Sequence, residues 1–129
     1  MGDKRIKSAL LSVYHKNGLD ELVETLHEQG VQMYSTGGTA AYISSLGYDV
    51  NLVEDITGYP SILGGRVKTL HPAVFGGILA RRENTQDLEE LKSFNLPLFD
   101  LVVVNLYPFE EYLQSDASES DLIEKIDIG

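Results

Sequence analysis

The sequence contains no cysteine among its 129 residues. This absence excludes disulfide bonds, cysteine-ligated zinc and a thiol nucleophile. Long apolar runs are also missing, and the short one near the N-terminus leads at once into polar residues without a small-residue cleavage site. We therefore expect neither a signal peptide nor a membrane span, and the cytoplasm is the expected compartment. The length suits one domain without repeats or linkers.

Positive charge is scarce, because 10 Lys and Arg residues face 20 Asp and Glu residues and the net charge is −10. So acidic a surface repels nucleic acid and anionic lipid, and we expect neither as a partner. No Lys or Arg occurs between Lys16 and Arg66; Lys68 and His71 then follow Arg66 in a glycine-led loop, Gly64–Pro72. Such a cluster suits an anion or a developing negative charge, although a solvated basic loop also accounts for it.

Apolar residues make up 43% of the chain, which is enough for a core, and predicted strands alternate with helices. This alternation predicts an α/β fold: a single domain whose mainly parallel sheet carries helices on both faces. The stretch 57–77 has no clean period and is expected to be functional or to hide an element. The expected strands are 6–13, 31–34, 48–53, 78–80 and 100–106, and the expected helices are one capped by Asn17, one capped by Thr39, 85–94 and 118–126.

In a parallel sheet, ligands bind outside the carboxyl ends of the strands. Lys16 follows the first expected strand, and the segment Ser35-Thr36-Gly37-Gly38-Thr39 follows the second and opens a helix. Glycines allow backbone N–H groups to approach a ligand closely, and helix N-termini favour anions. These residues predict a phosphate cradle, with a plain turn and helix cap as the alternative. The segment is neither a P-loop nor the fingerprint G-x-G-x-x-G.

The strongest predicted strand is LVVVNL, whose continuous apolar run suits a strand covered on both faces, and Tyr107 follows it. The Tyr107 hydroxyl suits proton donation, and packing on the sheet edge is the simpler interpretation. Asp127 lies between apolar residues, as cap and turn residues often do. The three histidines lack metal-ligand spacing, so we expect no metal. No serine nucleophile motif occurs either.

Five segments together resemble the IMP cyclohydrolase domain family. The resemblance runs from about Leu10 to the last residue, and its most specific parts are GGRVKTLHP, NLYPF and IDIG. STGGT alone is shared with the related methylglyoxal synthase fold. The segments, in the family's order, are STGGTA at 35–40, GGRVKTLHP at 64–72, GGILARR at 76–82, VVVNLYPF at 102–109 and EKIDIG at 124–129.

The resemblance implies a methylglyoxal synthase-like α/β domain that closes the second ring of inosine monophosphate. The substrate would be a small ribotide, 5-formamidoimidazole-4-carboxamide ribotide, and neither cofactor nor metal would be needed. In the family this domain precedes an AICAR formyltransferase domain, to which 10-formyltetrahydrofolate would belong. Residues 1–129 would then be a cyclohydrolase domain truncated at its C-terminal end, with a homodimer left open as its assembly.

The family's roles carry over to matching positions. Lys68 would act at the carboxamide and formyl oxygens, Tyr107 would be its acid/base partner, and Asp127 would handle a proton near the formyl group. Thr69 and Asn105 would position the heterocycle. The phosphate and neighbouring groups would be held by Ser12, Lys16, Thr36, Gly37, Gly38, Thr39 and Arg66.

The sequence departs from the family pattern in two places. Tyr14 and His15 stand where the family usually has Ser and Asp. Tyr14 thus replaces a small hydroxyl residue that binds the phosphate in the family. A second catalytic lysine follows the IDIG motif in the family and lies beyond Gly129. Two other functions share the fold: a non-catalytic regulatory domain and a methylglyoxal synthase-type lyase. Convergence of Lys68, Tyr107 and Asp127 beside the phosphate loop would favour the cyclohydrolase over both.

Overall fold

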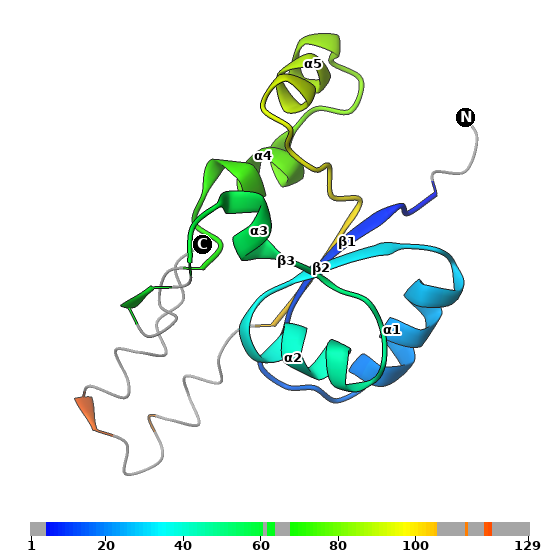
Figure 1. The fold of residues 1–129 in the computed structure, drawn as a ribbon, viewed down its shortest axis with the longest axis vertical. Helices are drawn as coiled ribbons and strands as arrows, with labels where there is room; N and C mark the ends of the chain where they lie inside the picture. The colour runs from blue at the N-terminus through cyan, green and yellow to red at the C-terminus, as the bar shows by residue number, and fades with distance from the viewer. Residues whose placement is uncertain (1–4, 61, 64–67, 106–112, 114–117, 120–129) are drawn as a thin grey trace.

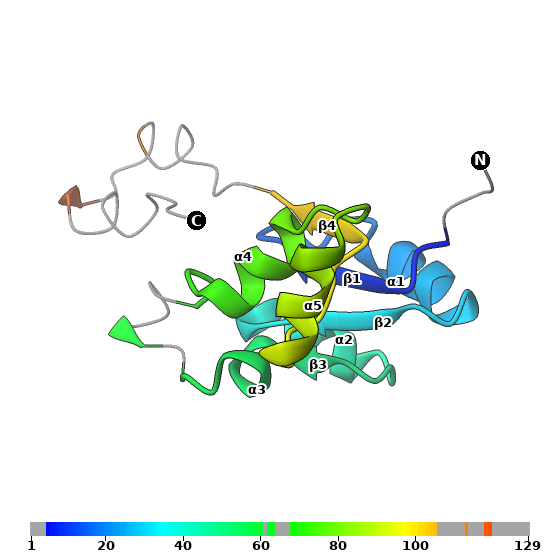
Figure 2. The same ribbon diagram turned by 90° about the horizontal axis from the view of Figure 1, so that it is seen from above.

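The computed structural model describes residues 5–60, 62–63, 68–105, 113 and 118–119. In this part of the chain (Figure 1), strands form one parallel sheet in the order β3-β2-β1-β4, and all four strands are labelled in Figure 2. The central strand β1 pairs through Ala9 with Met33 on one side and with Leu101 on the other. The elements are β1 (Ser8–Ser12), α1 (Leu19–Glu28), β2 (Gln32–Ser35), α2 (Gly37–Ser45), β3 (Asn51–Leu52), α3 (Val53–Thr57), α4 (Pro72–Leu79), α5 (Thr85–Ser93) and β4 (Leu101–Val104).

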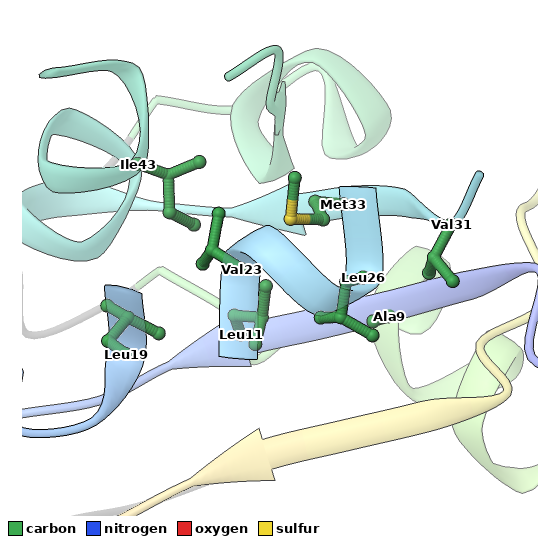
Figure 3. Close-up of a cluster of buried hydrophobic side chains, with 8 residues drawn as sticks. All are labelled: Ala9, Leu11, Leu19, Val23, Leu26, Val31, Met33 and Ile43. Carbon is green, nitrogen blue, oxygen red and sulfur yellow. The ribbon is translucent and has the colours of Figure 1, made fainter. Parts of the chain in front are cut away.

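One face of the sheet is covered by α1 and α2. Leu19, Val23 and Leu26 recur at helical spacing, so α1 presents a buried apolar stripe to the strands (Figure 3). Ala9 and Leu11 point to this face from β1 because alternate strand residues share a face. Full burial of a leucine side chain contributes about 1.5–3 kcal/mol, so this cluster is a main source of stability.

The opposite face is covered by α3 and α4. Leu10 points away from its β1 neighbours and packs with Val53, Val74 and Phe99, all at most 3% exposed. Figures 1 and 2 show α3 and α4 on the side of the sheet opposite α1 and α2, with α5 beyond α4. The predicted α/β class, the parallel sheet and the helices on both faces are therefore confirmed.

Several predicted boundaries are wrong. Residues 78–80 are the last turn and C-cap of α4, which is the element hidden in the stretch 57–77 and beyond it. The third strand is only Asn51–Leu52, because Val53 already begins α3. Thr39 lies in the first turn of α2, whose N-cap is Thr36, and Gly18 is the N-cap of α1. The expected helix 118–126 lies outside the described residues except for 118 and 119.

Strand β4 forms where the strongest strand signal predicted it, but it is not buried on both faces. Leu101 and Val103 pack on the α1 side, whereas Val102 is 38% and Val104 is 61% exposed. The reason is its place at the edge of the described sheet, where α3 and α4 pack against β1 rather than β4. The carboxyl ends of β1, β2 and β4 lie at one edge of this sheet, and the predicted site residues lie just beyond them.

Candidate functional site

The loop after β1 holds the Lys16 side chain against the start of α2. The Lys16 ammonium donates to the carbonyl oxygens of Val13 and, at 3.3 Å, Tyr14, and it lies 3.4 Å from Thr39 Oγ1. Partial burial of the ammonium, and then the positive charge of Lys68, lower the pKa of Lys16 below its ordinary value of 10.5. The two lysines therefore share one electrostatic environment.

The Thr39 side chain ties the start of α2 to the same loop. Its hydroxyl donates to the Val13 carbonyl at 3.0 Å and accepts from the Val13 N–H at 3.1 Å. Thr39 is only 4% exposed, and both hydrogen bonds bridge residues that are 26 positions apart. We read the Thr39 side chain as a positioning group that sets where the amides of α2 lie relative to Lys16.

Thr36 makes a different long-range contact. Its side chain does not cap α2; the hydroxyl donates instead to a carboxylate oxygen of Glu54 in the first turn of α3. Thr36 is 3% exposed. Its one hydroxyl proton is thus used within the protein, and the groups left to face a ligand here are backbone N–H groups. The first N–H groups of a helix have no acceptor within the helix.

Gly37 and Gly38 open α2 on the molecular surface, and both are exposed. Gly37 has φ +57°, a conformation that favours glycine. A Cβ atom added to Gly37 would lie 3.0 Å from Lys68 Nζ, so the Lys68 ammonium occupies the space that a side chain would fill. Lys16 and Lys68 therefore flank the amides of one helix start, and the whole arrangement suits an anion.

Lys68 also lines a cavity of about 180 Å³ between the end of α3 and the start of α4. His71 lies in its wall, and the His71 Nδ1 atom accepts from the Ala73 N–H at 3.0 Å as the N-cap of α4. The remaining lining residues are Thr57, Tyr59, Pro60 and Leu70.

Asn105 follows β4 and reaches across to the loop after β1. Its Oδ1 atom accepts from the Tyr14 N–H, and its Nδ2 atom donates to the His15 carbonyl at 3.5 Å. The Asn105 side chain thus fastens this loop to the end of β4. Thr69 is half-buried, and its carbonyl accepts from the His71 N–H at 2.8 Å. Ser12 is half-buried at the end of β1.

The structure brings together most of the predicted phosphate residues that it describes, and Lys68 joins them. Arg66, Tyr107 and Asp127 lie outside the described residues. Sequence reasoning missed Glu54, and it named His71 only as part of the basic loop and not as the N-cap of α4. A histidine followed by Pro72 signals a helix start, because proline is favoured at the first helical position, whereas no local signal marks the Thr36–Glu54 contact.

A larger surface hollow of about 530 Å³ lies beside Arg81 and Arg82. Arg81 pairs with Asp87 and Arg82 with Asp100, so each guanidinium already has a carboxylate partner. We therefore do not assign an anion to this hollow. In the described part of the chain, no group of His, Cys, Asp or Glu side chains has metal-site geometry, and no helix could cross a membrane.

Comparisons with known proteins identify relatives of the chain. The chain is 62% identical over 126 residues to the bifunctional purine biosynthesis protein PurH of Bacteroides thetaiotaomicron, and these residues are 98% of the chain and 25% of that protein. It is 52% identical to the PurH proteins of Natranaerobius thermophilus and Aquifex aeolicus, covering 98% and 94% of the chain and 24% of each. The chain thus spans about a quarter of the length of these relatives.

A solved structure is similar as well. The crystal structure of ForH superposes with a TM-score of 0.78 at 35% sequence identity, over 96% of the chain and 63% of ForH. The family model of the MGS-like domain matches residues 18–129, which include every element from α1 onward. The chain belongs to the MGS-like domain family.

Proposed function

We propose that this chain is an IMP cyclohydrolase domain, which converts 5-formamidoimidazole-4-carboxamide ribotide to inosine monophosphate and water in purine synthesis. The observation that carries the proposal is the convergence of Lys16 and Lys68 on the exposed start of α2. The family and the names of the PurH relatives support it.

The ribotide phosphate would lie over the start of α2. Backbone N–H groups at Gly37, Gly38 and Thr39 would bind its oxygens, and the Lys16 ammonium would balance its charge. Burial and, to a smaller extent, repulsion from Lys68 lower the pKa of Lys16, and a bound dianion would offset that repulsion. This local positive charge is needed because the chain as a whole carries a net charge of −10 and would otherwise repel an anionic ligand.

The reaction forms one carbon–nitrogen bond and releases one water molecule. The carboxamide nitrogen attacks the formyl carbon and loses one proton, and the formamido nitrogen loses a second proton as it becomes doubly bonded to that carbon. The formyl oxygen gains negative charge, takes up two protons and leaves as water when its bond to the carbon breaks. Lys68 would stabilise the developing oxyanion, with Tyr107 and Asp127 moving protons. Arg66 would assist phosphate binding. Four further residues would either contact the ligand directly or hold the loops around it in place: Ser12, Thr36, Thr69 and Asn105. Holding the two reacting groups together supplies the remaining rate enhancement.

The same proposal extends to the protein as a whole. Residues 1–129 would be the N-terminal part of a longer cytoplasmic enzyme that also carries a formyltransferase domain, and 10-formyltetrahydrofolate would serve only that domain. The cyclohydrolase step would use no cofactor or metal. A homodimer is the assembly that we would test first, by light scattering of the purified protein.

Titration with inosine monophosphate, followed by a cyclisation assay, tests the proposal. The unsubstituted full-length protein should bind inosine monophosphate and close the ring of the formamido substrate. Lys16→Met should weaken binding roughly 10- to 150-fold, because a charge-assisted contact contributes about 1.5–3 kcal/mol. Lys92→Met removes the same charge from the exposed face of α5 and is the matched control.

The two alternatives predict different results. Binding without turnover in the full-length protein would favour a regulatory domain. Release of methylglyoxal from dihydroxyacetone phosphate would favour a lyase. If the Lys16→Met and Lys92→Met variants bind inosine monophosphate with equal affinity, the phosphate does not bind at the start of α2.

A further inference from the structure

His71 has two distinct nitrogen environments. Nδ1 accepts the Ala73 N–H at 3.0 Å, so it carries a lone pair rather than a proton. In the neutral ring the proton is then on Nε2, since the hydrogen bond at one nitrogen sets the protonation of the other. His71 is half-buried and lines the cavity of about 180 Å³. The helix cap thus fixes a ring whose second nitrogen is an N–H donor.

The size of the cavity restricts what can enter it. Pockets that bury a whole drug-sized ligand are usually about 300–1,000 Å³, so a cavity of about 180 Å³ can bury only part of a ribotide. Its lining includes the apolar bodies of Tyr59 and Pro60 and two residues whose side chains carry nitrogen, Lys68 and His71. The chemistry of this wall matches a flat ring that carries an oxygen acceptor.

Lys68 connects this cavity with the start of α2. Its ammonium lies in the space above Gly37, and its side chain also lines the cavity. A ligand whose phosphate lies at Gly37–Thr39 therefore has a neighbouring compartment for its other end. The two compartments differ in chemistry: the start of α2 offers backbone amides and ammonium charge, and the cavity is lined by Tyr59 and by the His71 imidazole.

We infer that this cavity receives the heterocyclic end of the nucleotide and that His71 Nε2–H donates a hydrogen bond to an oxygen on that ring. The inference rests on the proposed function and adds a positioning residue to it. His71 would orient the ring next to the Lys68 ammonium, while its Nδ1 atom keeps the start of α4 in place. No covalent role is assigned to His71.

Two isosteric substitutions separate the two nitrogens. In His71→Asn, the amide oxygen can replace Nδ1 as the helix cap, and the Nε2 donor is lost. In His71→Gln, the amide nitrogen can replace Nε2 as the donor, and the cap is lost. Loss of a helix cap should lower the Tm of the Gln variant by about 3–5 °C, whereas the Asn variant should melt within about 1 °C of the unsubstituted chain.

The ligands are inosine monophosphate, which has both ends, and ribose 5-phosphate, which has no heterocycle. His71→Asn should raise the Kd for inosine monophosphate roughly five- to tenfold, as expected for one lost hydrogen bond, and leave the Kd for ribose 5-phosphate unchanged. His71→Gln should bind both ligands within about twofold of the unsubstituted chain at a temperature where it is folded.

The outcomes separate this inference from the proposed function. If His71→Asn binds inosine monophosphate normally, or weakens both ligands equally, the assignment of His71 is overturned while the phosphate site stands. If the unsubstituted chain binds neither ligand, the proposed function and the inference are overturned together.

Discussion

Two adjacent glycines in α4 provide a sharp test of the packing described above. Gly76 and Gly77 are both helical, yet only Gly77 is buried against the chain that leads into β4. A Cβ atom on Gly77 would lie 2.4 Å from the Pro97 carbonyl oxygen and 2.8 Å from Phe99 Cδ2. At Gly76 the nearest atom would be Leu96 Cδ1 at 3.4 Å, an ordinary contact. Alanine therefore fits at one position and not at the other.

The expected magnitudes follow from these distances. Alanine is favoured over glycine in a helix by about 0.8–1 kcal/mol, so Gly76→Ala should stabilise the chain by up to ~1 kcal/mol. Gly77→Ala gains the same term, but backbone atoms must move by about 1 Å, and such overpacking costs about 1–3 kcal/mol. The movement also strains the hydrogen bond from the Phe99 N–H to the Gly77 carbonyl, 3.0 Å long and worth about 0.5–1.5 kcal/mol. The net destabilisation should be about 1–3 kcal/mol.

Urea unfolding followed by circular dichroism measures both variants under one set of conditions. The unfolding midpoints should differ while the slopes with urea agree, because only native-state packing changes. Gly77→Ala should unfold at lower urea than the unsubstituted chain, and Gly76→Ala at equal or higher urea. If Gly77→Ala is as stable as Gly76→Ala, then α4 does not pack on Pro97 and Phe99 as described.

Three further expectations concern charge and catalysis. Lys68→Met should raise the pKa of Lys16 by removing a neighbouring positive charge; an unchanged pKa, measured by NMR of the lysine side chain, would place the two ammonium groups too far apart to interact. In the full-length protein, Lys68→Ala and Tyr107→Phe should each slow ring closure roughly 10²–10⁴-fold, and near-normal turnover in both would remove them from the mechanism. The Arg81 guanidinium holds the pKa of Asp87 at about 2, below the ordinary 3.8. The stabilisation from this pair is therefore complete above pH 3.8 and lost as the pH falls toward 2, and a carboxyl that titrates near 3.8 by NMR would contradict it.

The sequence predicts the parallel sheet well because its strands are short apolar runs separated by helical patterns. It also predicts where an anion site should lie, since Lys16 and Gly37–Thr39 each follow a strand and parallel strands end at one edge. The wrong strand at 78–80 has a clear cause. Helix propensity disfavours the glycine pair before it, but tertiary packing overrides that preference, because Gly77 lies against Phe99.

Contacts between distant segments are what sequence reasoning could not reach. The hydroxyl of Thr36 donates to Glu54, 18 positions away, and no local pattern distinguishes this from a helix cap. The cap made by His71 was within reach, because Pro72 marks the first helical residue, but its role in a cavity wall depends on α3. The assigned roles of Arg66, Tyr107 and Asp127 stay predictions.

The central position of β1 has a consequence for the order in which the chain folds. Its pairing with β2 joins Ser8 to Gln32, a short loop that α1 can close as soon as the first segments are synthesised. Its pairing with β4 joins segments that are 92 residues apart, as in the contact between Ser8 and Asp100. Loop closure over such a span is entropically costlier and slower. On the ribosome, the β4 side of β1 therefore stays unpaired until residues 101–104 have emerged, and we expect chains released before that point to aggregate through this edge.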